Sequence, residues 1–446
     1  MHRNHSAHPL DVYRETNYLV FPWGVRAHSA GCAARCGQIN HHRNLMSINR
    51  PNVNAAVDGA VGTKDHYLIL DGLRGVAALV VVLFHICEAY SPDHPLTQVI
   101  NHGYLAVDFF FLLSGFVVAY AYDDRWSSMS ISGFFKRRLI RLQPMVIMGM
   151  TLGALLFYFQ AGATFPLIQS TPIWQVIVVM LVGYTLLPLP PSLDIRGWGE
   201  MHPLNGPAWS LFFEYVANIL YAVGLRKVSN RVLVILAGFA ALFLMQLAVF
   251  GKRGDLIGGW SLEPEQLHIG FARLLFPFLA GMLLMRLGKR LHVKHAFMVS
   301  GALLVIALAV PRLGGADHLW INGLYESLCI IVIFPLVVAI GAGGSLHKPV
   351  GRRVATWLGD ISYPLYITHY GLIYIYTQWI SKHDASPLVS KGVGALVFVG
   401  TVAIAFVCLK YYDEPVRKWL QSKANSARKD GRHEIARAGD QPTLDA

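Results

Sequence analysis

The sequence predicts an all-α membrane protein that crosses the bilayer many times. Of its 446 residues, 54% are hydrophobic and only 14% are charged, whereas about a quarter of a soluble chain is charged. Apolar segments close to the roughly 20 residues that a transmembrane helix needs recur along the chain. The net charge of +12 is explained by basic loops that face anionic lipid. The lipid bilayer, and not nucleic acid, is therefore the expected partner of these charges.

Each apolar segment is expected to form a helix, and the charges between the segments assign the sides of the membrane. The segments are 72–90, 104–122, 143–160, 173–189, 208–225, 231–250, 269–287, 296–311, 323–341, 362–380 and 392–410. Connections rich in Lys and Arg stay in the cytoplasm; they are 136–141, 226–231, 286–294 and 348–353. Both termini are then cytoplasmic, which requires an even number of crossings. We expect about 10 transmembrane helices, with 173–189 as a re-entrant or partial segment, in a multi-pass membrane protein.

Both ends of the chain are expected to be disordered polar tails around one membrane domain. Residues 1–63 lack the ordered basic, apolar and small-residue regions of a signal peptide, and Met46 within them is an alternative start. The membrane domain is expected over 64–422, followed by the second tail over 423–446. The cysteines lack the spacing of metal ligands, so no metal site is expected; they are Cys32, Cys36, Cys87, Cys329 and Cys408.

The first apolar segment contains ionisable residues on one helix face. In "DGLRGVAALVVVLFH" (71–85), Arg74 and His85 are 11 residues apart. This is almost three helical turns, so the two side chains share a face about 16 Å apart along the axis. Glu88, one turn after His85, is placed to hold the imidazole in one tautomer. A histidine so placed is either a general base or a core residue bonded to a neighbouring hydroxyl or carbonyl.

The second apolar segment, "GYLAVDFFFLLSGFVVAY" (103–120), also places polar residues at membrane depth. Asp108 needs a partner there, which Arg74 or His85 would supply, or it only pins two helices together. Ser114 and Gly115 form a small pair that is suited to close helix packing.

The stretch "FFKRRLIRLQP" (134–144) presents arginines at the membrane surface. Arg138 and Arg141 have the RxxR spacing that puts them on one helix face, and Arg137 adds a guanidinium group beside them. Guanidinium groups bind phosphates bidentately, so this stretch is a candidate phosphate clamp. The alternative is ordinary anchoring of a cytoplasmic loop by basic residues.

Two later stretches supply candidates for substrate contacts. "NGPAWSLFFEYVANILY" (205–221) places Glu214 about one turn inside an apolar segment, where a carboxylate is costly unless it is paired. "GDISYPLYITHY" (359–370) is expected to lie around a Pro-kinked helix start, and its tyrosines are also typical of an interfacial belt. The candidate residues are Trp209, Ser210, Tyr363 and His369, with Asp360 and Ser362 nearby.

Taken in order, these stretches resemble the membrane-bound acyltransferase-3 family. The resemblance rests on "LDGLRG…H", "VDFFFLLSGF", "RRLIRLQP", "WSLFFE" and "GDISYPLYITH", and it runs from about 68 to 418. The Arg-x10-His signature of the family is matched by Arg74 and His85, and its RxxR by Arg138 and Arg141. Members that modify polysaccharides often read Glu-Glu after the WSL motif, whereas this chain has only Glu214 there.

The resemblance implies a bacterial O-acyltransferase of the cell inner (plasma) membrane. Such an enzyme moves an acyl group, by default acetyl, from cytoplasmic acyl-CoA to a hydroxyl of a surface or exported glycan or glycolipid. Acyl-CoA is then a co-substrate, and no permanently bound cofactor is expected. The CoA phosphates would dock at Arg138, Arg141 and Arg137, and the thioester would reach toward His85.

In this interpretation His85 is a general base for the acceptor hydroxyl or a nucleophile that relays the acyl group. Asp108 or Glu88 would orient His85, and Arg74 would bind CoA or stabilise the oxyanion. Glu214 completes the catalytic candidates. Two other classes of protein stay open: a polytopic secondary transporter of a small solute, and a non-catalytic membrane scaffold or sensor.

Overall fold

The computed structural model describes residues 66–90, 98–424 and 426, and this part of the chain is helical without a β-strand. The prediction of an all-α protein is therefore confirmed. The expected N-terminal tail, with Met46, Cys32 and Cys36, lies outside the described residues, as does most of the expected C-terminal tail. From Tyr67 onward the described chain belongs to one compact unit.

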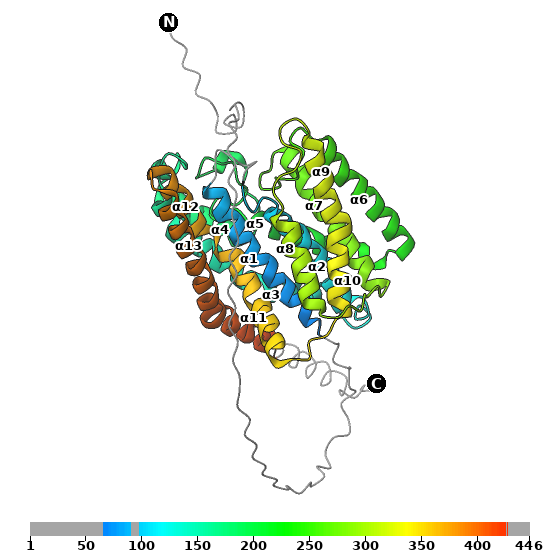
Figure 1. Ribbon diagram of the computed structural model, residues 1–446. Coiled ribbons are helices and arrows are strands. Elements are labelled where there is room, and N and C mark those ends of the chain that lie inside the picture. The colour runs from blue at the N-terminus through cyan, green and yellow to red at the C-terminus, as the bar shows by residue number, and fades with distance from the viewer. Residues whose placement is uncertain (1–65, 91–97, 425, 427–446) are drawn as a thin grey trace, which may run out of the picture. The chain divides into compact units, whose positions relative to one another are not determined.

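The helices of this unit are α1 (Leu68–Tyr90), α2 (Ala106–Tyr122), α3 (Ile131–Leu156), α4 (Ile173–Gly183), α5 (Ala208–Val223), α6 (Asn230–Phe250), α7 (Pro264–Arg286), α8 (Ala296–Ala309), α9 (Leu319–Leu328), α10 (Phe334–Gly343), α11 (Pro349–Thr368), α12 (Tyr370–Lys382) and α13 (Pro387–Cys408). A π-helical segment (Cys329–Ile333) joins α9 to α10, and another (Leu409–Asp413) follows α13. In Figure 1, α1 lies near the middle of the unit, between α6 on one flank and α13 on the other.

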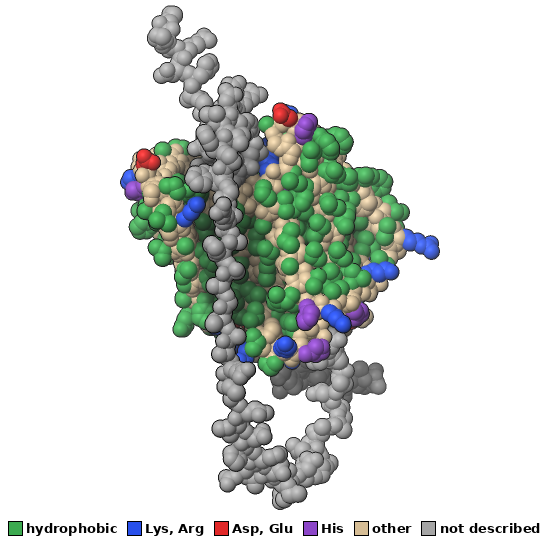
Figure 2. All heavy atoms as spheres, viewed as in Figure 1, with side chains coloured by type: hydrophobic (Ala, Val, Ile, Leu, Met, Phe, Trp, Pro, Cys, Tyr) green, Lys and Arg blue, Asp and Glu red, His purple; other side chains and the backbone are tan. Residues whose placement is uncertain are grey.

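Seven helical stretches of the described chain are long and apolar enough to cross a membrane: Leu68–Tyr90, Gly103–Tyr122, Ile131–Gln160, Asn230–Phe250, Pro264–Arg286, Leu319–Gly343 and Pro387–Ala424. The apolar helices α5 and α8 are shorter, at 16 and 14 residues. Figure 2 shows a largely apolar lateral surface, with many of the charged and histidine side chains gathered toward the ends of the helices. A multi-pass membrane protein is thus confirmed, whereas the number of crossings and the side of each terminus stay predictions.

The helix α4 enters and leaves the bundle from the same end. It has 11 residues, about 17 Å of helix, which is little more than half of a bilayer core. At its start, Tyr158, two residues after α3, donates a hydrogen bond to the Thr171 carbonyl over 2.8 Å. After its end, the Gln143 amide from the first half of α3 donates to the Tyr184 carbonyl. The chain then returns, and Leu204 packs against Gly153 near the end of α3. This path agrees with the partial segment expected at 173–189.

Glycines let the central helices approach closely. Gly115 of α2 lies against the backbone of Phe278 in α7, and Gly281 of α7 lies against the backbone of Leu112. A side chain at either position would overlap the partner helix. The same device joins α1 to α11, where Gly75 lies against the backbone of Leu358. These contacts set the depth at which the polar residues of α1, α2 and α11 face one another.

The helix α11 corrects the expectation for 359–370. Asp360 and Tyr363 do not lie at a helix start but in the middle of α11, which continues past the internal Pro364. The chain leaves regular helix at His369, where α11 ends and α12 begins. Hydropathy located only the apolar half of this element, because the first half of α11 carries polar and basic residues. The first half of α11 is stabilised instead by close packing of Ala355 and Leu358 on the glycines of α1.

Candidate functional site

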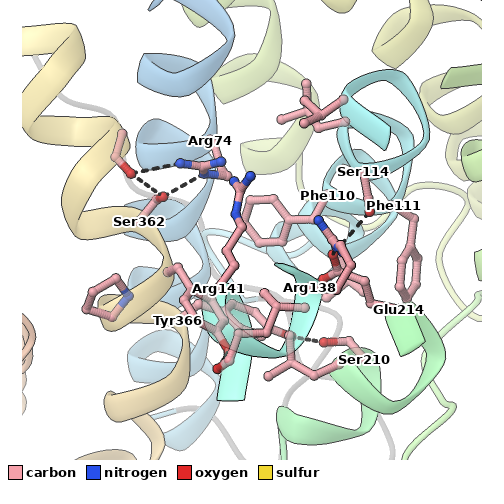
Figure 3. Close-up of a pocket in the computed structure, with 18 of the residues that line it drawn as sticks. Arg74, Phe110, Phe111, Ser114, Arg138, Arg141, Ser210, Glu214, Ser362 and Tyr366 are labelled. Atoms are coloured by element: carbon pink, nitrogen blue, oxygen red, sulfur yellow. Dashed lines mark hydrogen bonds and ion pairs between the residues drawn. The ribbon is translucent and has the colours of Figure 1, made fainter. Parts of the chain in front are cut away.

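A cavity of about 180 Å³ lies between α1, α2, α3, α5 and α11 and the segment that follows α13. Its polar lining includes Arg74, Arg138, Arg141, Ser210, Glu214 and Ser362 (Figure 3). These residues come from four stretches that the sequence singles out separately. We call this cavity the arginine pocket.

The side chain of Arg74 is fixed by α11. Its Nε donates to Ser362 Oγ over 2.7 Å, and its Nη2 donates to the Gly359 carbonyl over 3.0 Å. Asp71, one turn earlier on α1, lies 3.4 Å from the same Nη2. The parallel packing of α1 and α11 thus positions a guanidinium group at the wall of the pocket.

Glu214 is paired, as a carboxylate at this depth must be. Arg138 Nη2 lies 2.5 Å from Glu214 Oε1, and Ser114 Oγ donates to the same oxygen over 3.1 Å. The interpretation of the Ser114–Gly115 pair as packing holds for Gly115 only, because Ser114 lines the pocket. The motif glutamate is therefore a fixed partner of the first RxxR arginine.

Arg141 is the guanidinium group of the pocket that has no fixed partner. Its side chain is exposed and lines the cavity, and it makes no hydrogen bond or ion pair with any residue that the structure describes. Arg74 and Arg138 are close enough to act on it electrostatically, as are the carboxylates of Glu214 and Asp71, each of which already lies beside one of those two arginines. A cation held beside two others is a site for an anion. Arg137, by contrast, lies outside the pocket and is placed beside Met129 Sδ, 3.4 Å away.

His85 does not line the arginine pocket. Its Nδ1 lies 2.8 Å from Glu88 Oε2, the contact that the spacing on α1 predicts. The imidazole ring stacks on His369 at a centroid distance of 5.5 Å and meets the edge of Tyr370 at 4.8 Å. Arg74 and His85 thus face the same helix pair, since Arg74 contacts α11 and His85 contacts the junction of α11 and α12.

His369 lies between His85 and the pocket. It is fully buried, and its Nδ1 lies 3.1 Å and 2.9 Å from the carbonyls of Leu365 and Tyr366. Nδ1 therefore carries the proton, which leaves Nε2 as an acceptor. That atom has no hydrogen-bond partner within the described residues. The Tyr366 ring, which lines the pocket, lies 6.1 Å from the His369 ring.

The remaining substrate-contact candidates divide between the pocket and the core. Ser210 and Tyr363 line the pocket; the Ser210 hydroxyl is 2.7 Å from the Tyr366 hydroxyl, and the Tyr363 hydroxyl donates to the Leu142 carbonyl over 2.7 Å. Trp209 does not line it. It is buried, and Arg273 lies over its ring at 5.2 Å.

The expected partner of Asp108 was wrong. Asp108 contacts neither Arg74 nor His85, but forms a buried ion pair with Arg273 of α7 at 2.7 Å. Arg273 Nη2 also donates to the Tyr104 carbonyl over 2.7 Å. The alternative, that Asp108 pins two helices together, is the one that the structure supports. The sequence signal was Arg273 itself, which lies inside the apolar segment 269–287 rather than at its end, and sequence reasoning missed it.

A second polar cluster near His85 was also missed, in the loop between α4 and α5. Tyr374 of α12 donates to Glu200 over 2.6 Å, and Arg196 is fully buried with its guanidinium group 3.5 Å from the Tyr374 ring centroid. Tyr370 contacts the rings of both Tyr374 and His85, at 4.5 Å and 4.8 Å. Burial raises the pKa of Glu200 to about 7, so a carboxyl group that titrates near neutrality lies two aromatic rings from His85.

Comparison with known proteins shows which family this chain resembles. The model of the acyltransferase domain matches residues 67–411. The chain is 35% identical over 194 residues to Protein 2 in picA locus of Rhizobium radiobacter, which covers 42% of this chain and 97% of that protein. It is 26% identical over 325 residues to Acyltransferase MdmB of Streptomyces mycarofaciens, covering 68% and 78%.

A third relative is longer than this chain. O-acetyltransferase OatA of Staphylococcus aureus is 20% identical over 366 residues, which cover 78% of this chain but only 57% of OatA. No solved structure shows a significant match. The match to the domain model covers every residue of the arginine pocket discussed above, together with His85 and His369. The chain belongs to the acyltransferase-3 family of membrane-embedded acyltransferases.

Proposed function

We propose that this protein transfers an acyl group, by default acetyl, from acyl-CoA to a hydroxyl of an exported glycan or glycolipid. The observation that carries the donor assignment is Arg141. A free guanidinium group beside Arg74 and Arg138, in a cavity open to solvent, suits the phosphates of CoA better than a neutral solute. The cavity is smaller than the roughly 300–1,000 Å³ of a site for a drug-sized ligand, so it would hold part of the donor rather than the whole molecule.

The acyl group would travel along α1. Arg74 and His85 share a face about 16 Å apart along the axis, and the pantetheine arm of CoA is an extended chain that suits such a path. Tyr366 and His369 lie between the pocket and His85. Donor binding would therefore move one of these side chains to bring the thioester to His85.

At His85, two reactions fit the geometry. With Glu88 at Nδ1, Nε2 would accept the proton of the acceptor hydroxyl while that oxygen attacks the thioester carbon and CoA leaves as the thiol. Alternatively, Nε2 would attack the thioester itself, forming an acyl-imidazole that the hydroxyl then cleaves. Asp108 has no part in either path, because Arg273 holds it elsewhere.

The acceptor would approach from the end of the bundle opposite to the start of α1. His85 lies near the end of α1 and its side chain is partly exposed. Glu200 and the loop that follows α4 lie beside it through Tyr370 and Tyr374. If α1 begins at the cytoplasmic face of the inner membrane, as the basic loops predict, the end of the bundle that holds His85 lies at the opposite face. That face is where an exported glycan would be.

The test uses membranes that contain equal amounts of folded wild type, His85→Ala, Arg141→Gln or Arg137→Gln. Labelled acetyl-CoA is supplied with a glycan extract of the host, and ester-linked label is counted. We expect transfer by the wild type and Arg137→Gln, loss in His85→Ala, and a raised KM for acetyl-CoA in Arg141→Gln. Equal transfer by wild type and His85→Ala would remove His85 from the mechanism. Solute uptake into vesicles without acyl-CoA, and no transfer of label, would favour a transporter instead.

A further inference from the structure

Two residues beyond the matched domain also line the arginine pocket. The family match ends at 411, but the pocket wall includes Asp413 and Arg417. Asp413 is the last residue of the π-helical segment Leu409–Asp413, and Arg417 lies one turn later on the helix that continues from it. A π-helical turn is rare, and such turns are frequent at functional sites. Here the turn places Asp413 in the pocket wall, and the helix that continues from it places Arg417 there.

The ion pair of Asp413 and Arg417 leaves polar atoms of both side chains without hydrogen-bond partners. Arg417 Nη2 lies 2.7 Å from Asp413 Oδ2. Asp413 Oδ1 and Arg417 Nε are both buried and have no hydrogen-bond partner among the described residues. An ion pair that leaves a buried donor atom and a buried acceptor atom unsatisfied is costly. The Asp413–Arg417 pair is therefore a weak structural contact, and a better anion can replace Asp413 as the partner of Arg417.

Arg417 is one of the two more exposed arginines of the pocket. Its side chain is 33% exposed, against 26% for Arg74 and 4% for Arg138, and Arg141 is exposed as well. It follows α13, at the end of the bundle where α11 begins, while Ser210 at the start of α5 marks the far side of the pocket. A donor whose thioester points inward past Ser210 keeps its nucleotide end at Arg417.

We propose that Arg417 binds the 3′-phosphate of the acyl-CoA donor, and that Asp413 holds Arg417 while the pocket is empty. This inference rests on the proposed function, since it assigns a phosphate of the same donor. The 3′-phosphate is on the ribose, far from the thioester, so it binds Arg417, the pocket arginine that follows α13 at the end of the bundle where α11 begins. The diphosphate lies nearer the thioester and falls to Arg141 and Arg138. On binding, the phosphate replaces the Asp413 carboxylate at the Arg417 guanidinium group.

The experiment compares Arg417→Gln with Lys418→Gln in the full-length membrane protein, using acetyl-CoA and 3′-dephospho-acetyl-CoA as donors. Lys418 is the matched control, because it is an exposed neighbouring cation that does not line the pocket. We expect Arg417→Gln to raise KM for acetyl-CoA about 10-fold. Its KM for the dephospho donor should equal that of the wild type, kcat should be unchanged, and Lys418→Gln should behave as wild type with both donors.

Asp413→Asn separates donor binding from a structural role. If Asp413 competes with the phosphate, this variant lowers KM for acetyl-CoA, opposite to Arg417→Gln. A mere staple would instead lower the melting temperature in both variants and leave both KM values alone, which would overturn the inference. An equal rise in KM for both donors in Arg417→Gln would overturn the assignment to the 3′-phosphate. If the wild type transfers label from neither donor, the proposed function itself fails.

Discussion

His85 and His369 stack with their ring centroids 5.5 Å apart and their planes 28° from parallel. One comes from α1 and the other from the junction of α11 and α12. The two imidazoles differ in their surroundings: His85 is partly exposed and bonded to Glu88, whereas His369 is buried and bonded to backbone carbonyls. In the proposed mechanism, the exposed imidazole is the one that the acceptor would reach, and the buried imidazole packs behind it.

Removal of His85 should abolish most of the activity, and Glu88 should act only through it. We expect His85→Ala to lower kcat by roughly 10²–10⁴-fold, and Glu88→Gln to lower it about 10-fold through loss of the charged partner at Nδ1. In the double variant Glu88→Gln should cost nothing further. Rates of label transfer at saturating acetyl-CoA measure this cycle, and fully additive effects would show that Glu88 acts elsewhere.

Substitution of Arg141 should weaken donor binding without loss of fold. Because Arg141 has no fixed partner, Arg141→Gln leaves no carboxylate unpaired, and we expect a rise in KM for acetyl-CoA of about 10-fold or more. Arg138→Gln should differ, because it leaves Glu214 without its cation and so also destabilises the protein. Parallel measurement of KM and of the melting temperature in detergent distinguishes the two. A stability loss in Arg141→Gln would contradict this assignment.

Asp108 and Arg273 should behave as a structural pair. Asp108→Asn leaves a buried guanidinium group without its charge partner, which costs about 3–5 kcal/mol. Replacement of both residues, as Asp108→Leu with Arg273→Met, removes both charges and should recover part of that loss. Thermal unfolding in detergent checks the order of the three proteins. If Asp108→Asn kept wild-type stability but lost acyl transfer, the catalytic role that the structure argues against would be restored.

The stability of the folded protein should depend on pH through the protonation of Glu200. Its pKa is raised from 4.5 to about 7 by burial, so the folded state holds a proton that the unfolded state releases above pH ~4.5. Glu200 therefore adds stability at low pH that is lost as the pH rises toward 7, on the order of 3 kcal/mol.

Glu200→Gln imitates the protonated carboxyl and should remove this loss. The difference in melting temperature between variant and wild type should grow between pH 5 and pH 8. Burial lowers the pKa of His202 to about 3, so His202 reduces stability as the pH falls below ~6.5. Both proteins contain His202, so its effect drops out of the difference in melting temperature. A difference that does not change with pH would mean that Glu200 is ionised throughout this range.

Local spacing allowed several contacts to be predicted from the sequence. The Glu88–His85 contact follows from residues three apart on one helix, and the helical fold follows from apolar segments of spanning length. The arginines of α1 and α3 were recognised separately by their motifs. Their meeting in one pocket depends on the packing of α1 on α11 and of α3 on α5, which no local pattern encodes.

Long-range pairing explains what the sequence did not predict. Asp108 and Arg273 are 165 residues apart, so an aspartate in need of a cation had several candidates and no local rule to choose among them. Glu200 and Arg196 lie in the loop after α4, and the path of this loop depends on where α4 ends and the chain turns back. The extent of α11 was underestimated because its first half carries polar and basic residues and stays largely exposed, with only Ala355 and Leu358 buried, against Gly72 and Gly75 of α1.

The path of α4 has a consequence for how such a protein changes over time. A segment that enters and leaves by one end can be lengthened, shortened or exchanged without inverting any helix that follows it. The loop after α4, which carries Glu200 and Arg196, lies beside His85 and away from Arg141. In the proposed mechanism, substitutions and insertions there would reshape the acceptor side while the donor side keeps its form. The two proposed binding sites could therefore diversify independently within an unchanged arrangement of helices.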